Sequence, residues 1–262
     1  MITTSEHIDV NRTDGVLTLT MNRPAKKNAL TQEMYAALAD NVVAAQSDPD
    51  IRVVVLTGTA DSFTAGNDLA DFAGGPGKAK RGENEIPPVG RFLQAILQAE
   101  KPLLAAVNGL AVGVGVTMLL HCDLVYASPN ATFQTPFVNL GLVPEAGSSL
   151  LMPRLVGQQK ANELLLLGKK IDAVEAERIG LIAGVLDADT LQHDVAQVAA
   201  TLAARAPNAV KLTKSLVKHE RDDVAQQMAD ESVHFSAQLQ TAEFAEAASA
   251  FAERRPADFS KL

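Results

Sequence analysis

The 262-residue sequence contains no tryptophan, only two tyrosines and a single cysteine, Cys122. Without tryptophan the core has to be built mainly from aliphatic side chains, and 47% of the residues are hydrophobic. One cysteine excludes an intramolecular disulfide and fits a reducing compartment. The length allows one large domain, or a domain with an appendage.

Positive charge is also scarce. The chain carries 23 Lys and Arg residues against 31 Asp and Glu residues, for a net charge of −8. Non-specific nucleic-acid binding needs a basic surface that neutralises phosphates, so we expect no nucleic-acid partner. An anionic ligand would require local clusters of Lys and Arg.

Long hydrophobic runs are limited to one candidate, residues 102–121, which carry no formal charge over about a membrane-spanning length. Asn108-Gly109 is a strong turn signal inside this run, and Gly113 and Gly115 weaken any continuous helix. We therefore expect a buried strand followed by a buried helix, and no membrane partner.

Hydrophobic patterning predicts an α/β core. A helix is expected after Thr31, a good N-cap residue, and helical patterns dominate after about residue 150. Strands separated by helix-length segments favour βαβ units with right-handed crossovers. The predicted strands are residues 15–22, 51–58, 101–109 and 123–128.

We divide the chain into an α/β core over 1–200 and a helical C-terminal region over 201–262. Residues 72–90 are rich in glycine, proline and charge, which predicts a loop. The segment "GGPGKA" (74–79) is not a phosphate loop, since Ala79 replaces the Ser or Thr of that motif. The segment "GLAVGVG" (109–115) lacks the dinucleotide-binding spacing.

Two glycine-rich turns, each a corner between a strand and a helix, can present backbone N–H groups to a ligand. Ala65-Gly66-Asn67 follows the predicted strand 51–58, and small residues follow the turn at Asn108-Gly109. A helix N-terminus has free N–H groups and a partial positive charge, so two such corners of one sheet can form an oxyanion hole. The alternative is that these glycines only permit close packing.

Glu145 is the only charged residue between Asp123 and Arg154. Burial of a lone carboxylate raises its pKa or costs several kcal/mol. One interpretation places Glu145 in the first turn of a helix over 145–155, where the helix dipole stabilises it. The other makes it a base in an apolar pocket, with its pKa raised toward neutrality.

The histidines do not suggest catalysis or metal binding. We interpret His121 as structural, since no second nucleophile or base lies near it in sequence. The remaining histidines show no metal-ligand spacing, and we predict no metal site.

Five segments carry a resemblance to a known family: "MNRPAKKNAL" (21–30), "FTAGNDL" (63–69), "KPLLAAVNGLAVGVGVTMLLHCDLVYAS" (101–128), "TFQTPFVNLGLVPEAGSS" (132–149) and "GKKIDAVEAERIGLI" (168–182). Together they resemble the enoyl-CoA hydratase/isomerase (crotonase) superfamily, from about residue 7 onward. The resemblance implies a crotonase-like (ClpP/crotonase) spiral of ββα turns. It also implies an acyl-CoA thioester substrate, whose coenzyme A is not a separate cofactor, and a homotrimer or hexamer assembled partly through the C-terminal helices.

Site residues follow from the same resemblance. The amides of Asn67 and Val114 match the two groups that hold the thioester oxygen. The positions that match the coenzyme A site are Arg23, Lys26, Lys27, Ala65, Leu69 and Arg254. The other expected substrate contacts are Gly66, Gly113, Phe137 and Leu140.

Two departures from the hydratase pattern point to the reaction. Typical hydratases use two glutamates to position and activate water, and this chain has Thr117 and Phe137 at those positions. Glu145 instead matches the catalytic acid of the Δ3,Δ2-enoyl-CoA isomerase branch, particularly the peroxisomal type. We therefore predict an isomerase of fatty-acid β-oxidation in which Glu145 moves a proton from C2 to C4.

Alternatives remain open at this point: an enoyl-CoA hydratase, a non-catalytic acyl-CoA-binding protein, or a dienoyl isomerase with Asp68 as a second acid. The final residues "SKL" match a peroxisomal address, but we expect a cytoplasmic protein.

Overall fold

The computed structural model describes residues 5–68, 86–253 and 255–262. Its larger sheet has the strand order β1-β2-β3-β5-β7-β10, in which β1 pairs antiparallel with β2 and the other neighbours are parallel. The four predicted strands are confirmed as β2, β3, β5 and β7, whereas β1 and the two-residue β10 were missed. The bounds are β1 Ile8–Thr13, β2 Val16–Met21, β3 Val53–Gly58, β5 Leu103–Val107, β7 Leu124–Ala127 and β10 Gly184–Val185.

Short strands form a second sheet of order β4-β6-β8-β9. Its first three members each follow a strand of the larger sheet, so β3 leads to β4, β5 to β6 and β7 to β8. Each of these consecutive strand pairs therefore adds one strand to each sheet. None of the four was predicted, and β9 falls within the stretch predicted as helical. The bounds are β4 Ser62–Thr64, β6 Leu110–Val112, β8 Thr132–Gln134 and β9 Ile171–Asp172.

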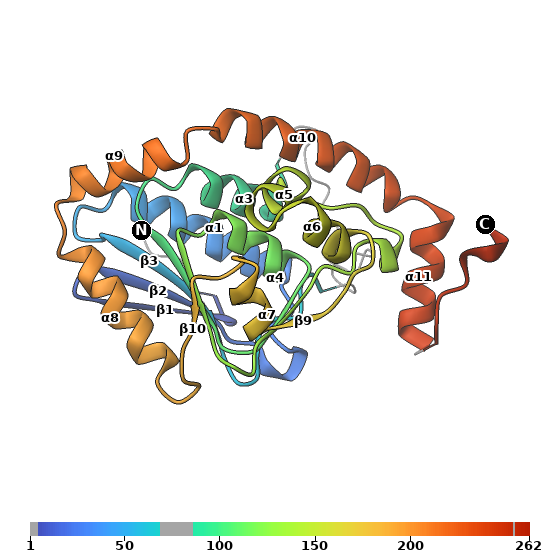
Figure 1. The fold of residues 1–262 in the computed structure, drawn as a ribbon, viewed down its shortest axis with the longest axis horizontal. Coiled ribbons are helices and arrows are strands. Elements are labelled where there is room, and N and C mark those ends of the chain that lie inside the picture. The colour runs from blue at the N-terminus through green and yellow to red at the C-terminus, as the bar shows by residue number, and fades with distance from the viewer. Residues whose placement is uncertain (1–4, 69–85, 254) are drawn as a thin grey trace.

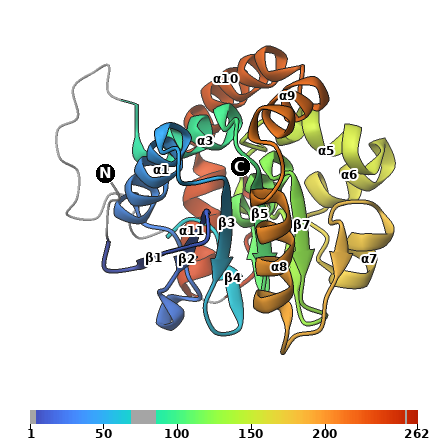
Figure 2. The same cartoon turned by 90° about the vertical axis from the view of Figure 1, so that its left-hand side faces the viewer.

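Helices cover both faces of the larger sheet (Figures 1 and 2). Val54 and Leu56 of β3 join the core formed with α1 (Gln32–Ser47) and α3 (Pro88–Gln98). Val53 and Val55 of the same strand pack in a second cluster with α8 (Leu191–Ala203). Because alternate side chains of a strand face opposite sides, a continuous apolar run is what a doubly covered strand requires.

The helix predicted after Thr31 is α1, and the Thr31 hydroxyl accepts a hydrogen bond from the amide of Met34 at 3.2 Å. The predicted loop 72–90 falls largely outside the described residues. Its last three residues are not loop, because α3 already begins at Pro88. Proline is well suited to a first helical turn, where its missing N–H would have no partner.

The uncharged run 102–121 is divided between β5, β6, the single-turn helix α4 (Val114–Thr117) and the 3₁₀ helix η2 (Met118–His121). The expected buried strand and buried helix are both present, with β6 between them. Within the described ranges, no helix has the length and apolar character needed to cross a membrane.

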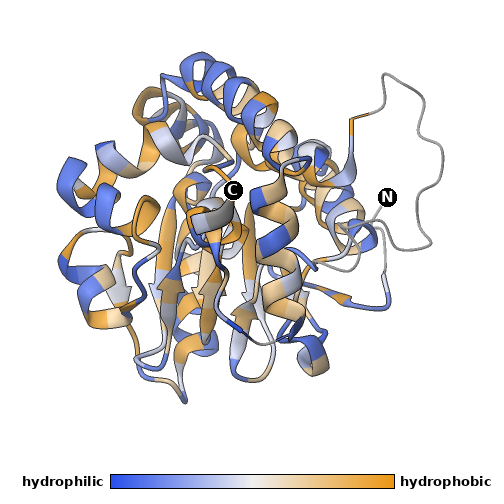
Figure 3. Cartoon of the chain, turned by 90° about the vertical axis from the view of Figure 1, so that its right-hand side faces the viewer, coloured by the Kyte–Doolittle hydropathy of each residue, from blue (hydrophilic) through white to orange (hydrophobic). Residues whose placement is uncertain are grey.

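After β8 the chain is mainly helical, and α9 and α10 extend across the top of the molecule in Figure 1. Helix α10 packs against α3 and α5 of the core. The hydropathy colouring in Figure 3 shows largely apolar strands and helices of mixed character. The bounds are α5 Ser148–Val156, α6 Gln158–Leu165, α7 Ala173–Arg178, α9 Pro207–Val217, α10 Arg221–Gln238 and α11 Ala242–Glu253, with 3₁₀ helices η1 Pro24–Lys26, η3 Val138–Leu140 and η4 Phe259–Lys261.

A buried lysine fastens α9 to the larger sheet. The Nζ of Lys214 donates to the carbonyl of Lys101 at 2.8 Å and to Oδ2 of Asp123 at 2.7 Å. The same Oδ2 accepts from the amide of Leu103 at 2.7 Å. Burial lowers the pKa of Lys214, while Asp123 raises it and so favours the charged form.

Replacement of this lysine should destabilise the fold. Lys214→Met removes the buried ammonium that binds both Oδ2 of Asp123 and the carbonyl of Lys101, and we expect the free energy of unfolding to fall by about 2 kcal/mol. Lys211→Met on the same helix removes an ion pair with Glu100 whose side chains are 40% and 56% exposed. That control should cost less than about 1 kcal/mol. Urea unfolding of both variants tests the difference, and equal losses would contradict it.

Candidate active site

The two glycine-rich corners lie side by side. Strands β4 and β6 pair in parallel, with Ser62 opposite Leu110 and Thr64 opposite Ala111. Beyond them, Gly66 has φ +90°, and a Cβ at this position would lie 2.9 Å from the carbonyl oxygen of Val112. Only glycine combines this dihedral with so close an approach. The structure therefore brings the two corners together, as predicted.

The amide of Asn67 points away from the neighbouring chain. Leu30 donates to the carbonyl of Gly66 at 2.8 Å and accepts from the amide of Asp68 at 2.9 Å. Because successive amides of an extended chain point to opposite sides, the intervening Asn67 N–H faces away from Leu30. Among the hydrogen bonds of the described residues, this amide has no acceptor.

Val114 presents a second amide at the adjacent corner. It is the first residue of α4, so its N–H has no acceptor within the helix. The preceding Gly113 has φ +57°, and a Cβ on it would have nothing within 4 Å, which indicates open space on this side. Across the described part of the chain, no acceptor is found for this amide either. Asn67 and Val114 thus offer two backbone donors next to each other, the arrangement that an oxyanion hole needs.

Tyr35 supports the first corner, and the sequence analysis missed it. Its hydroxyl donates to Oδ1 of Asn67 at 2.5 Å, and its ring packs at 5.8 Å from that of Phe92. Burial raises the pKa of Tyr35, and the charge of Glu145 raises it further, so the hydroxyl stays protonated as a donor. The sequence around Tyr35 contains no motif that marks its contact with Asn67, which is 32 residues away.

Glu145 is 9% exposed and lies in the segment between η3 and α5. Its Oε1 accepts a hydrogen bond from the hydroxyl of Thr117, which is fully buried, at 2.5 Å. Burial raises the pKa of Glu145 to about 7, the Thr117 hydroxyl opposes this rise, and the charge of Glu231 adds to it. A carboxylate with a pKa near neutrality is suited to take and return a proton.

The interpretation of Glu145 as a first-turn helix residue is wrong. Helix α5 begins at Ser148, and Gly147 is its N-cap. Ala146 and Gly147 both have left-handed backbone, with φ of +62° and +71°, so the chain turns between Glu145 and the helix. Such turns are hard to foresee because alanine rarely adopts this conformation.

His121 holds that turn. Its Nε2 lies 2.7 Å from the carbonyl oxygen of Ala146, which can only accept, so Nε2 carries the donated proton. Burial lowers the pKa of His121 to about 4, and the ring is neutral at physiological pH. These contacts agree with the structural interpretation of His121.

The expected coenzyme A residues lie partly beside the first corner. The carbonyl of Lys27 accepts from the amide of Ala65 at 2.9 Å, which joins the two segments. Lys26 and Lys27 are exposed. The guanidinium of Arg23 forms an ion pair with Asp68 at 2.6 Å. This pairing favours a structural role for Asp68 over that of a second acid.

The remaining predicted positions are distributed as follows. Phe137 is buried and Leu140 is half-buried, both in the segment that leads to Glu145. Leu69 and Arg254 lie outside the described residues.

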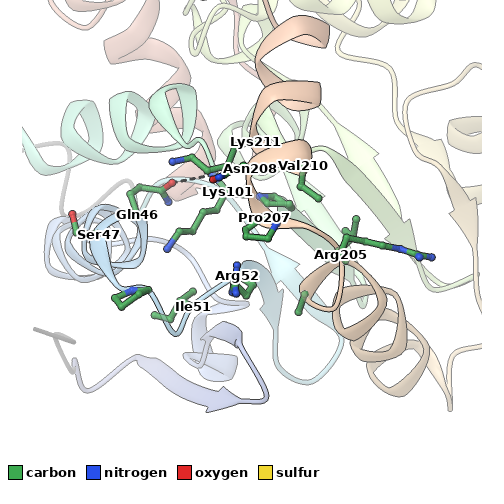
Figure 4. A pocket seen from close by; sticks show the side chains of 14 residues that line it. Gln46, Ser47, Ile51, Arg52, Lys101, Arg205, Pro207, Asn208, Val210 and Lys211 are labelled. Atoms are coloured by element: carbon green, nitrogen blue, oxygen red, sulfur yellow. Dashed lines mark hydrogen bonds between the residues drawn. The ribbon is translucent and has the colours of Figure 1, made fainter.

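A separate cavity of about 340 Å³ opens between the end of α1 and the start of α9 (Figure 4). Its wall contains Arg52, Lys101 and Lys211, but none of the predicted site residues. Lys101 donates to the carbonyls of Ala45 and Asp48, both at 2.6 Å, and Lys211 pairs with a glutamate. The cavity is therefore distinct from the Glu145 site.

Thr117 should control the pKa of Glu145. Thr117→Val keeps the side-chain shape and removes the O–H donor that favours the ionised carboxylate. A hydrogen bond to a charged group is worth roughly 1.5–3 kcal/mol, so the Glu145 pKa should rise by about one unit or more. Infrared titration of the carboxyl band lost in Glu145→Gln measures this shift.

A matched control is Thr135→Val, because Thr135 is equally buried but donates to the carbonyl of Leu164. It should leave the Glu145 titration unchanged. An unchanged Glu145 pKa in Thr117→Val would contradict the electrostatic role given to the hydroxyl.

Comparisons with known proteins agree with this geometry. The sequence model described as enoyl-CoA hydratase/isomerase matches residues 11–261. Enoyl-CoA delta isomerase 2 of Rattus norvegicus is 38% identical over 96% of this chain, which spans 65% of that protein's length. The 2,3-dehydroadipyl-CoA hydratase of Escherichia coli K12 is 36% identical over 95% of this chain and 97% of its own.

A solved structure extends the agreement to the fold. The crystal structure of an enoyl-CoA hydratase/isomerase from Pseudoalteromonas atlantica T6c superposes with a TM-score of 0.91 and 48% identity. That comparison covers 97% of this chain and 100% of the other. The two sheets, the paired corners and these matches together show that the chain belongs to the enoyl-CoA hydratase/isomerase (crotonase) family.

Proposed function

We propose that the protein is a Δ3,Δ2-enoyl-CoA isomerase, which moves a double bond of an acyl-CoA thioester into conjugation with the carbonyl. The observation that carries this proposal is the buried Glu145, with a pKa raised to about 7, in a site where Thr117 and Phe137 stand at the positions of the hydratase glutamates. One carboxylate that moves one proton is sufficient for an isomerisation without water.

The reaction begins with recognition of the thioester. Its carbonyl oxygen accepts hydrogen bonds from the amides of Asn67 and Val114. These fixed donors favour the negative charge that develops on the oxygen when C2 loses a proton. Because backbone groups supply both bonds, they need little reorganisation during the reaction.

Ionised Glu145 then removes a proton from C2 of the 3-enoyl thioester. The C2–H bonding electrons form the C1–C2 double bond of a dienolate, and the carbonyl electrons move onto the oxygen. Protonated Glu145 returns the proton to C4, where the C3–C4 π electrons form the new C–H bond. The C1–C2 π electrons become the C2–C3 double bond, and the carbonyl re-forms. The base is regenerated and no atom is gained or lost.

Thr117 and the surrounding side chains determine how the carboxylate acts. The hydroxyl of Thr117 occupies Oε1 of Glu145, which leaves Oε2 to carry the proton. Phe137 is 5% exposed, and an apolar surround of this kind excludes the water that a hydration would need.

Hydratase activity is the second candidate, because a hydratase is among the relatives of similar length. Hydration needs a group that deprotonates a positioned water, and neither Thr117 nor Phe137 has a side chain with that ability. For hydration, Glu145 alone would have to deprotonate the water and also protonate C2. Isomerisation requires it only to move one proton from C2 to C4.

Assembly into a trimer or hexamer is part of the proposal. Several apolar side chains of α9 are largely exposed in the single chain, and a second subunit would cover them. They are Leu212, Leu216 and Val217, with exposures of 66%, 77% and 73%.

A mass-resolved product assay tests the function. Purified protein should convert 3-hexenoyl-CoA to the 2-enoyl isomer without a change in mass. Glu145→Gln should abolish turnover, by at least about 100-fold, while acyl-CoA binding survives. Glu6→Gln, at an exposed site, is the control for loss of a surface carboxylate. A hydrated product from 2-hexenoyl-CoA at a comparable rate would refute the isomerase proposal, and binding without proton exchange would favour a non-catalytic protein.

The value of kcat should depend on pH through the ionisation of Glu145. The base must be ionised, and its pKa is raised to about 7. The value of kcat should therefore fall as the pH drops through about 7 and reach a plateau above it. A midpoint near the ordinary glutamate value would show that Glu145 is not buried in the working enzyme.

A further inference from the structure

Glu231 is a second buried carboxylate, and it approaches the candidate base from the C-terminal region. It lies on α10 and is 5% exposed. Its Oε2 accepts from the amide of Gly147 at 2.6 Å, and its Oε1 accepts from the amide and hydroxyl of Ser149 at 2.9 and 2.5 Å. Gln227, one turn earlier on α10, donates to the same hydroxyl at 2.9 Å.

These bonds cap the first turn of α5. Helix N-termini present amides without internal acceptors and favour negative charge, so a carboxylate is well placed there. Within the described residues, Glu231 forms no ion pair with Lys, Arg or His. The charge of Glu231 is therefore compensated by the α5 terminus.

The segment held in this way is the turn that follows Glu145. Its Ala146 has a left-handed backbone, with φ +62°, which is unfavourable for a residue other than glycine, so the turn persists only if its surroundings hold it. On one side, His121 bonds the carbonyl of Ala146. On the other, α10 approaches so closely that a Cβ on Gly147 would lie 3.0 Å from Cγ1 of Val224.

Among the described residues, Glu231 is the charged group that raises the pKa of Glu145. Tyr35 of α1 stays protonated, Thr117 of α4 is neutral, and the pKa of His121 in η2 is about 4. Burial raises the pKa of Glu231 itself, whereas its three hydrogen bonds lower it and so favour the charged form. Its negative charge raises the pKa of Glu145.

We propose that Glu231 is a positioning residue for Glu145, which clamps the turn between the base and α5 and makes the base dependent on the docking of α10. This inference rests on the proposed function for its kinetic consequence. The clamp itself involves only groups of this chain, so it can be tested without turnover.

The test compares Glu231→Gln with Asp230→Asn. Glu231→Gln keeps the side-chain size, but removes the charge and turns one acceptor into an NH₂ group that faces N–H or O–H donors. Asp230 is the exposed neighbour on the same helix, so Asp230→Asn removes a surface charge without touching the turn. The first readout is the infrared titration of Glu145, assigned by the band lost in Glu145→Gln. The second is kcat and KM with 3-hexenoyl-CoA.

In Glu231→Gln, the Glu145 titration should move to lower pH, because a like charge is lost and the turn loosens. The value of kcat should fall roughly 10- to 100-fold with little change in KM, since displacement of a base by about 1 Å is enough for such a loss. Asp230→Asn should match the wild type in both. A Glu145 titration identical in all three proteins would overturn the proposal.

Ser149→Ala is the second variant, for the case in which Glu231→Gln does not fold. It leaves both carboxylates in place and removes one hydrogen bond of the clamp. We expect a several-fold fall in kcat with the Glu145 titration close to that of the wild type, and unchanged kcat would overturn the proposal. If the wild-type protein shows no isomerisation, the proposed function fails, and the titration of Glu145 in Glu231→Gln still decides the role of Glu231.

Discussion

The burial of one carboxylate, that of Glu145, is the constraint on which the site depends. Removal from water disfavours the charged form, and the hydroxyl of Thr117 restores only part of the lost solvation. The balance leaves a pKa of about 7, where the group can exist in either protonation state. The negative charge of Glu231 adds to the rise, whereas a nearby cation would lower the pKa toward its ordinary range.

The second sheet explains why the two backbone donors meet. Each repeat of the chain ends in a short strand, and the parallel pairing of β4 with β6 places their following corners together. A function carried by backbone amides places few demands on side-chain identity. Val114 can therefore supply one of the two backbone donors, since the preceding Gly113 adopts the positive φ of +57° that the corner requires.

Family membership and reaction are separate questions for this protein. In the proposed function, the backbone donors of the fold recognise the thioester, and the reaction depends on which carboxylates surround the acyl group. Relatives named as isomerases and as hydratases both match this chain, and one fold can host several reactions. The proposed assignment to the isomerases rests on Thr117 and Phe137, which have no carboxylate, and on the buried Glu145.

The sequence by itself determined the features that depend on local chemistry. Apolar runs indicated the doubly covered strands, Thr31 indicated the start of α1, and the isolation of Glu145 indicated a perturbed acid. Only the tertiary structure decided the three-residue strands, which are too short to have a pattern. It also decided the left-handed Ala146, the bond of Tyr35 to Asn67 and the approach of Glu231 to α5. These features join residues far apart in the chain, or depend on a backbone conformation that its own residue disfavours, so no local pattern records them.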